Sequence, residues 1–210
     1  MFCVVVGVSL LCLHGATFLN CRTEDQLAER ARRVIGWSAA VFVVSFLLAG
    51  VWVSYGVDGY AVSSTIDPNA ANVPLGKTVN KASGLWLSNY SAFPALLLAP
   101  GLAAAAAVLS VVSAVKHFAG TAFFLSSLTV FATLLTAGGS MFPFIIPSSA
   151  DPASSLIVWD ASASRYTLQL LFFATAAFMP IVIGYTAWVY RVMRGKVTVA
   201  DVQNNQHILY

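Results

Sequence analysis

The chain has 210 residues, of which 59% are hydrophobic and 9% charged, and its formal net charge is +3. A soluble domain usually carries about 25% charged residues, so this much apolar surface cannot be hidden in one small water-soluble core, and part of it must face lipid. The weak positive charge is spread in short clusters between apolar runs, which excludes the basic stripe of a nucleic-acid-binding protein.

Apolar runs long enough to cross a bilayer dominate the sequence. A hydrocarbon core about 30 Å thick needs about 20 apolar residues in helix, and runs without period-two alternation favour helix over strand. The runs that meet this length are, in chain order, 1–19, 34–55, 93–115, 120–142 and 166–190. The first run lacks the positive start and the cleavage site of a signal peptide, so we interpret it as a spanning helix. The sequence therefore predicts an all-α, polytopic integral membrane protein with about five transmembrane helices in one membrane domain, 1–210.

Basic residues between the runs predict the orientation. Eight lie in the linker 20–33, in the turn after the third helix and in the tail 191–210. The opposite side has three, namely Lys77, Lys81 and Arg165. Because basic residues concentrate on the cytoplasmic side, we predict that the N-terminus is outside and the C-terminus cytoplasmic. The outer loops are then 56–91 and 143–165.

Tryptophan and tyrosine flank both ends of the predicted helices. The outer ends carry Trp52, Tyr55, Trp86, Tyr90, Trp159 and Tyr166. The inner ends carry Trp37, Tyr185, Trp188 and Tyr190. Each of these side chains has an apolar ring and a polar edge and therefore favours the headgroup layer, in agreement with the predicted spans. Trp52 and Trp159 are candidate structural or interface residues.

Histidine supplies the deepest ionisable side chain. His14 lies near the inner end of the first predicted helix, and ionisable groups at membrane depth are costly and often functional. It could ligate haem iron or relay protons. The alternative, which we favour, is a histidine that is hydrogen-bonded to a neighbouring helix or reaches the interface. We expect His117, in a turn, and His207, in the tail, to be solvated.

Two outer carboxylates are candidate structural or interface residues. Asp58 lies in the turn-forming string Tyr55–Tyr60, which predicts an Asx turn that organises the loop. Asp160 precedes the last predicted helix and could cap it, or stand just before capping by Ser162 or Ser164. The alternative for Asp160 is a role in proton exit or in contact with a partner.

Two prolines and one run of small residues bear on helix packing. Pro100 and Pro180 fall inside the third and fifth predicted helices, where neighbouring helices can satisfy the freed carbonyls. We expect both to serve packing, and the alternative is a kink that shapes a cavity. Ala103–Ala107 forms a small-residue face that allows close approach of another helix.

Cysteines and known motifs indicate no self-sufficient active site. The cysteines are Cys3, Cys12 and Cys21. They lack CxxC spacing, so neither a metal site nor a disulfide framework is supported, and we expect buried, inert thiols. The sequence also lacks CxxCH, Walker, GxGxxG and HExxH motifs, so it assigns no catalytic, cofactor or metal residue to this chain alone.

Several strings, in order along the chain, point to a family. They are His14–Leu19, Val51–Tyr60, Met141–Ser149, Ala153–Ser164, Gly184–Tyr190, Gly195–Thr198 and His207–Tyr210. Together they closely resemble subunit II of the cytochrome bd-type quinol oxidases. The family member normally has eight helices, and this chain resembles its C-terminal part, from about the fourth helix onward. The resemblance therefore implies a fragment, a truncated product or half of a split subunit, in which Met1 is not the ancestral start.

The resemblance also implies a function in aerobic respiration. Such oxidases take electrons from ubiquinol or menaquinol and reduce dioxygen to water in the bacterial cytoplasmic (inner) membrane. Haem b and haem d are held by subunit I, and subunit II supports that partner and carries quinone in some members. We expect subunit I, lipid, quinone and a small accessory subunit as partners, and no nucleic acid. The alternatives are a membrane transporter and an assembly-only remnant.

Overall fold

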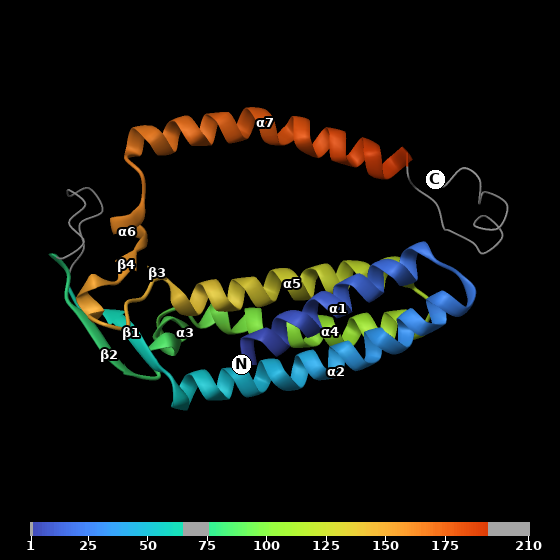
Figure 1. Cartoon of the computed structure of the whole chain (residues 1–210), viewed down its shortest axis with the longest axis horizontal. Helices are drawn as coiled ribbons and strands as arrows, with labels where there is room; N and C mark the ends of the chain where they lie inside the picture. The colour runs from blue at the N-terminus through green and yellow to red at the C-terminus, as the bar shows by residue number, and fades with distance from the viewer. Residues whose placement is uncertain (1, 65–75, 193–210) are drawn as a thin grey trace.

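Long helices dominate the computed structural model, which describes residues 2–64 and 76–192 (Figure 1). The five that are long and apolar enough to cross a membrane are α1 (Phe2–Arg22), α2 (Asp25–Gly56), α4 (Leu98–Val115), α5 (Ala119–Met141) and α7 (Arg165–Val192). A short 3-10 turn, η3 (Pro94–Leu97), leads directly into α4. The prediction of a multi-pass, helical membrane protein is therefore confirmed.

Four of these helices, α1, α2, α4 and α5, form a bundle (Figure 1). Helix α1 packs along α2, and α4 packs along α5, while contacts of α1 with α5 and of α2 with α4 close the ring. Leu13, Ile35 and Phe42 are fully buried at its centre. Lipid tails are as apolar as leucine, so close van der Waals contact between small-residue faces holds such helices together.

The small-residue face of α4 takes part in this contact as predicted. Ala103, Ala106 and Ala107 are buried, and Ala114 and Ala122 continue the same packing at the end where α4 turns into α5. Pro100 differs from the prediction because it is the third residue of α4 rather than an interior one. The first turn of a helix has no partners for its N–H groups, so a proline is tolerated there without breaking the helix.

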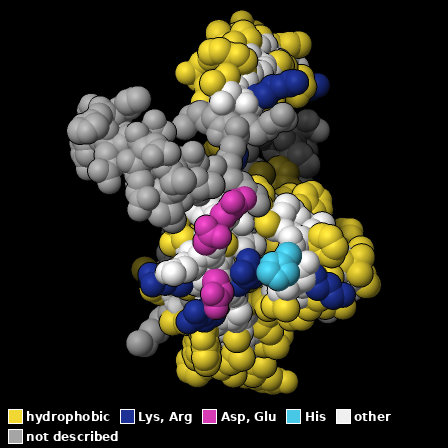
Figure 2. Space-filling view, turned by 90° about the vertical axis from the view of Figure 1, so that its right-hand side faces the viewer, with side chains coloured by type: hydrophobic (Ala, Val, Ile, Leu, Met, Phe, Trp, Pro, Cys, Tyr) yellow, Lys and Arg dark blue, Asp and Glu magenta, His cyan; other side chains and the backbone are white. Residues whose placement is uncertain are grey.

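The segment 20–33, predicted as a linker, is mostly helical. Helix α1 continues to Arg22 and α2 begins at Asp25, which leaves only Thr23 and Glu24 between them. The 32 residues of α2 make it about 48 Å long, well beyond the hydrocarbon core. Hydropathy did not reveal its first turns because charged residues cover their outer side. Figure 2 looks onto this end, hereafter the turn end, and shows charged side chains gathered there with apolar side chains around them.

The outer loops contain short strands, which the all-α prediction missed. Strands β1 (Asp58–Val62) and β2 (Val79–Ser83) form an antiparallel hairpin, and β3 (Phe144–Ile146) pairs with β4 (Leu156–Ile157). The short helical segments around them are η2 (Leu85–Leu87), α3 (Ser88–Ala92), η4 (Pro152–Ser154) and α6 (Val158–Ala161). We call these strands and short helices, together with the described residues that connect them, the cap. Strands this short carry too few alternating residues to give a periodic signal.

Aromatic rings and one close backbone approach hold the cap together. The ring of Tyr60 lies 5.4 Å from that of Trp86 and 5.9 Å from that of Phe144, measured between centroids. Gly59 makes this possible, because a Cβ there would lie 2.3 Å from the backbone nitrogen of Trp86. Any side chain at position 59 would push η2 away from β1 and separate the rings.

Helix α7 stands apart from the bundle (Figure 1). None of its 28 residues is buried within the part of the chain that the structure describes. The helix runs without interruption through Pro180. The chain reaches α7 from α6 of the cap through the short segment Ser162–Ser164, so along the described chain the cap connects the bundle to α7.

Candidate functional site

A polar cluster lies between α1 and α5 inside the bundle. The Nδ1 atom of His14 lies 3.0 Å from the Oγ atom of Ser126, and the hydroxyl of Thr17 lies 2.7 Å from the same oxygen. Ser126 also donates to the carbonyl of Phe123 at 2.8 Å. The Nδ1–H group of His14 can donate to Ser126 while Ser126 donates to its own backbone. The Thr17 hydroxyl also lies 2.8 Å from the carbonyl of His14, so its one proton is shared between that carbonyl and Ser126. The cluster joins two helices that lie far apart in the sequence.

The surroundings of His14 do not fit a haem ligand. Its ring is stacked on that of Phe123, with centroids 5.0 Å apart, and its Nδ1 atom is engaged with Ser126. An axial ligand needs a ring nitrogen that faces room for the macrocycle, and none of the three hollows described below is lined by His14. Across residues 2–64 and 76–192, no three His, Cys, Asp or Glu side chains lie close enough to hold a metal ion. The geometry is that of a histidine bonded to a neighbouring helix.

The cap contains a buried ion pair that the sequence did not reveal. The Nζ atom of Lys77 binds a carboxylate oxygen of Asp160, and their side chains are only 4% and 10% exposed. Asp160 lies in α6 and does not cap α7, which was the first of its two predicted capping roles. The structure has the second, in which Asp160 precedes a capping serine, because the Oγ atom of Ser164 accepts from the backbone nitrogen of Thr167 at 3.3 Å. The pair links residues 83 positions apart, so no local pattern could have identified it.

The other predicted residues of this end are more exposed. Asp58 is the first residue of β1 and lies 3.6 Å from Lys81 on β2, so the hairpin replaces the predicted Asx turn. The ring of Trp52, on the last turns of α2, is tilted against Phe2 at 6.2 Å. Trp159 meets Phe142 edge-on at 5.9 Å and lines a hollow of about 610 Å³ under the cap.

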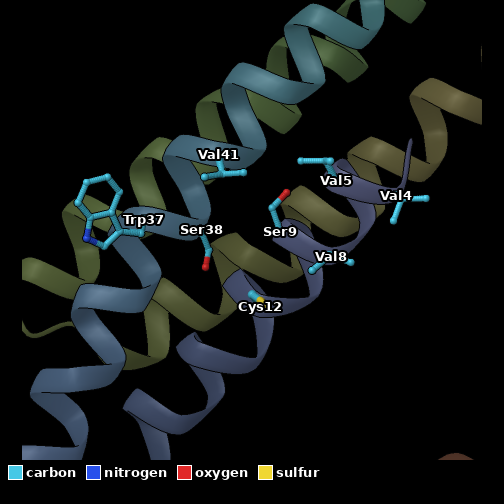
Figure 3. Close-up of a pocket in the computed structure, with 8 residues that line it drawn as sticks. All are labelled: Val4, Val5, Val8, Ser9, Cys12, Trp37, Ser38 and Val41. Carbon is cyan, nitrogen blue, oxygen red and sulfur yellow. The ribbon is translucent and has the colours of Figure 1, made fainter. Parts of the chain in front are cut away.

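An apolar groove of about 380 Å³ runs between α1 and α2 (Figure 3). Its lining residues are Val4, Val5, Val8, Ser9, Cys12, Trp37, Ser38 and Val41. Cys12 opens onto this groove and Cys3 is also exposed, so the expectation of buried thiols is wrong for both. These positions lie on the outer side of α1, whereas its buried face contains Leu13 and Thr17. The lining of the groove is apolar apart from the hydroxyls of Ser9 and Ser38 and the thiol of Cys12.

A third hollow, of about 330 Å³, lies at the turn end. It is lined mainly by polar and charged side chains from the α1–α2 connection, together with residues of the α4–α5 turn. His117 lies there, exposed as predicted and with a positive φ of 63°. His207 and the last part of the predicted tail lie outside the described residues.

Comparisons with known proteins agree with this architecture. A family model described as Cytochrome bd terminal oxidase subunit II matches residues 1–193. The Cytochrome bd-I ubiquinol oxidase subunit 2 of Escherichia coli (strain K12) is 43% identical over 206 residues, which are 98% of this chain and 54% of the relative. The Probable cytochrome oxidase subunit 2 of Haemophilus influenzae is 40% identical over 210 residues, which are 100% of this chain and 55% of the relative.

A more distant relative shows the same extent of match. The Cytochrome bd ubiquinol oxidase subunit 2 of Bacillus subtilis (strain 168) is 27% identical over 194 residues, 92% of this chain and 49% of the relative. The chain thus spans about half the length of the curated relatives it matches. Since the family model covers the bundle, the cap and α7 alike, the chain belongs to the cytochrome bd terminal oxidase subunit II family.

Proposed function

We propose that this chain is part of subunit II of a bd-type quinol oxidase in a bacterial cytoplasmic membrane. The observation that carries the proposal is the family match over residues 1–193, with relatives named as subunits of ubiquinol oxidases. In this role the chain supports a haem-bearing subunit I while ubiquinol or menaquinol is oxidised and dioxygen is reduced to water. Haem b and haem d belong to the partner. This assignment agrees with the contacts of His14, whose ring lies within hydrogen-bonding distance of Ser126 and is stacked on Phe123.

The free surface of α7 supports a role in assembly. This helix exposes large apolar side chains along its length, among them Phe172, Phe173 and Ile181. A spanning helix that buries no residue against the described part of its own chain offers a complete face to another membrane segment. We assign that face to the rest of the oxidase, together with lipid, quinone and any small accessory subunit.

The positions of the basic residues support the proposed orientation. Arg22, Arg30 and Arg32 lie at the turn end, while the cap with Lys77 lies at the opposite end of the bundle. With basic residues on the cytoplasmic side, the turn end is cytoplasmic and the cap faces the periplasm or cell exterior. The C-terminal end of α7, with Arg191, is then also cytoplasmic.

Gene deletion tests the proposal directly. Membranes from a deletion strain should lose quinol-dependent oxygen uptake and the absorbance of haem d, and a plasmid copy of the gene should restore both. A plasmid copy with Asp58→Ala is a suitable control, because that change removes only an exposed ion pair. Unchanged oxygen uptake and haem spectra in the deletion strain would refute the proposal. The transporter alternative has no support from the named relatives.

A further inference from the structure

The polar hollow at the turn end has features of a ligand site that the proposed function does not use. It lies where α1 ends, α2 begins and α4 turns into α5, and Figure 2 shows acidic, basic and histidine side chains gathered at this end. The side chains that matter are Asn20, Arg32, Glu24 and Asp25. Their combination of donors and carboxylates indicates what the hollow can bind.

Asn20 supplies the first indication. Its side chain is 4% exposed, and its Oδ1 atom accepts a hydrogen bond from Arg32 at 3.4 Å. Its Nδ2 atom is buried and has no hydrogen-bond partner among the described residues. A buried N–H group without an acceptor is costly, so such groups nearly always have a partner in the functional state. A ligand oxygen in the hollow would supply this acceptor.

The N-termini of α2 and α5 also indicate that the hollow can bind an anionic oxygen. Neither Glu24 before α2 nor Phe118 before α5 makes a side-chain capping hydrogen bond. The first residues of both helices, Asp25 and Ala119, line the hollow. The first N–H groups of a helix are unpaired and carry partial positive charge, so they bind phosphate readily. With the Arg32 guanidinium, they form a donor set for an anionic oxygen.

The carboxylates of Glu24 and Asp25 line the same hollow, so a simple anion is not the expected ligand. They would repel a simple anion, but they are acceptors for a primary ammonium group. A ligand that satisfies both sides of the hollow therefore carries a phosphate and a primary amine. A phosphoethanolamine-type lipid headgroup has this chemistry.

The depth of the hollow agrees with a lipid headgroup. Arg32 precedes Trp37 along α2 by about 7.5 Å, and tryptophan favours the boundary between hydrocarbon and headgroups. The headgroup layer extends about 5–8 Å beyond the hydrocarbon core on each side. The hollow is therefore level with the phosphates of the adjacent leaflet.

We propose that this hollow binds the headgroup of an aminophospholipid. Asn20, Arg32 and the N-termini of α2 and α5 hold its phosphate, and Glu24 and Asp25 receive its ammonium. The site is independent of the oxidase reaction, so it can be tested whether or not the proposed function holds.

Native mass spectrometry of the protein in its membrane assembly tests this proposal. The assembly is placed in nanodiscs that contain equal amounts of phosphatidylethanolamine, phosphatidylglycerol and phosphatidylcholine. We expect about tenfold more retained phosphatidylethanolamine than either other lipid, equivalent to about 1.4 kcal/mol. Phosphatidylglycerol lacks the ammonium, and phosphatidylcholine has one without N–H donors. Equal retention of all three, or displacement of the lipid by millimolar inorganic phosphate, would overturn the proposal.

Matched variants locate the site. Arg32→Gln should abolish the preferential retention, whereas Arg30→Gln, on the exposed side of the same helix, should leave it unchanged. Asp25→Asn keeps the fold, since asparagine tolerates the positive φ of 54° at this position. This variant should retain phosphatidylglycerol and phosphatidylethanolamine equally. Loss of lipid in the Arg30→Gln variant, or unchanged selectivity in Asp25→Asn, would contradict the assignment.

Discussion

The bundle and α7 are equally suited to a bilayer, but they are packed very differently. Helices α1, α2, α4 and α5 bury alanine, serine and threonine side chains against one another. Helix α7 contains small residues too, at Ala174–Ala177, yet it buries nothing in the described part of the chain. The comparison shows that apolar character is enough to place a helix in lipid. It does not determine which other helix packs against the small-residue face.

The cap joins these two regions, and its buried ion pair is the strongest test of that connection. Asp160→Ala would leave the Lys77 ammonium buried without its carboxylate, a change that costs about 3–5 kcal/mol. We expect earlier unfolding of the purified protein in detergent and faster tryptic cleavage after Arg165. If α7 moves independently of the cap, the cleavage rate will not change.

An exposed pair provides the control for this experiment. Asp58→Ala removes the contact with Lys81, whose side chain is 41% exposed, and should cost less than about 1 kcal/mol. The double variant Lys77→Met/Asp160→Leu should recover most of the lost stability, because apolar side chains can replace a buried ion pair. Equal losses in Asp58→Ala and Asp160→Ala would contradict the buried character of the second pair.

Enlarging a small residue should distinguish the bundle from α7. Ala106 on α4 is only 1% exposed, so Ala106→Leu should destabilise the bundle by about 1–3 kcal/mol through overpacking. Ala177→Leu on α7 should leave the unfolding of the purified chain unchanged, since Ala177 is exposed. Under the proposed function, Ala177→Leu should instead reduce co-purification of subunit I. Destabilisation of the purified chain by Ala177→Leu would show that α7 packs on the bundle.

A smaller effect is expected within the polar cluster. Ser126→Ala removes the partner of His14 Nδ1, and hydrogen bonds between membrane helices contribute about 0.6 kcal/mol on average. A double-mutant cycle with His14→Phe should yield a coupling of that size, and Ser127→Ala, whose hydroxyl bonds its own helix, should show none. The haem spectrum of the complex should be unaffected, and its loss in His14→Phe would revive the ligand hypothesis.

The smallest effect concerns the attachment of the cap to α5. The hydroxyl of Tyr90 on α3 donates to the carbonyl of Thr136 at 2.9 Å, and burial raises the pKa of Tyr90 above its ordinary value. Because the folded pKa is raised, its contribution to stability is complete below about pH 10 and is lost as pH rises through the folded pKa. An ultraviolet titration of wild type against Tyr90→Phe should show this tyrosine ionising above pH 10. Ionisation at the ordinary value would indicate that α3 has detached from α5.

Local signals in the sequence correctly predicted some features of the candidate sites and not others. The Ala103–Ala107 face and Ser164 as a cap are short-range patterns, and the structure has both. The ion pair of Asp160 was not predicted, because its partner, Lys77, is remote in the chain. The thiol of Cys12 was expected to be buried, but a long apolar run does not reveal which of its faces meets another helix.

The sequence by itself determined that five segments enter a bilayer, because the length and apolar character of each run are local properties that set its transfer from water to lipid. Only the tertiary structure decided which four helices form the bundle, that two hairpins cover one end and that Asn20 faces a polar hollow at the other. Those features depend on contacts between residues distant in the chain. Their energies come from close packing and hydrogen bonding, to which hydropathy is insensitive.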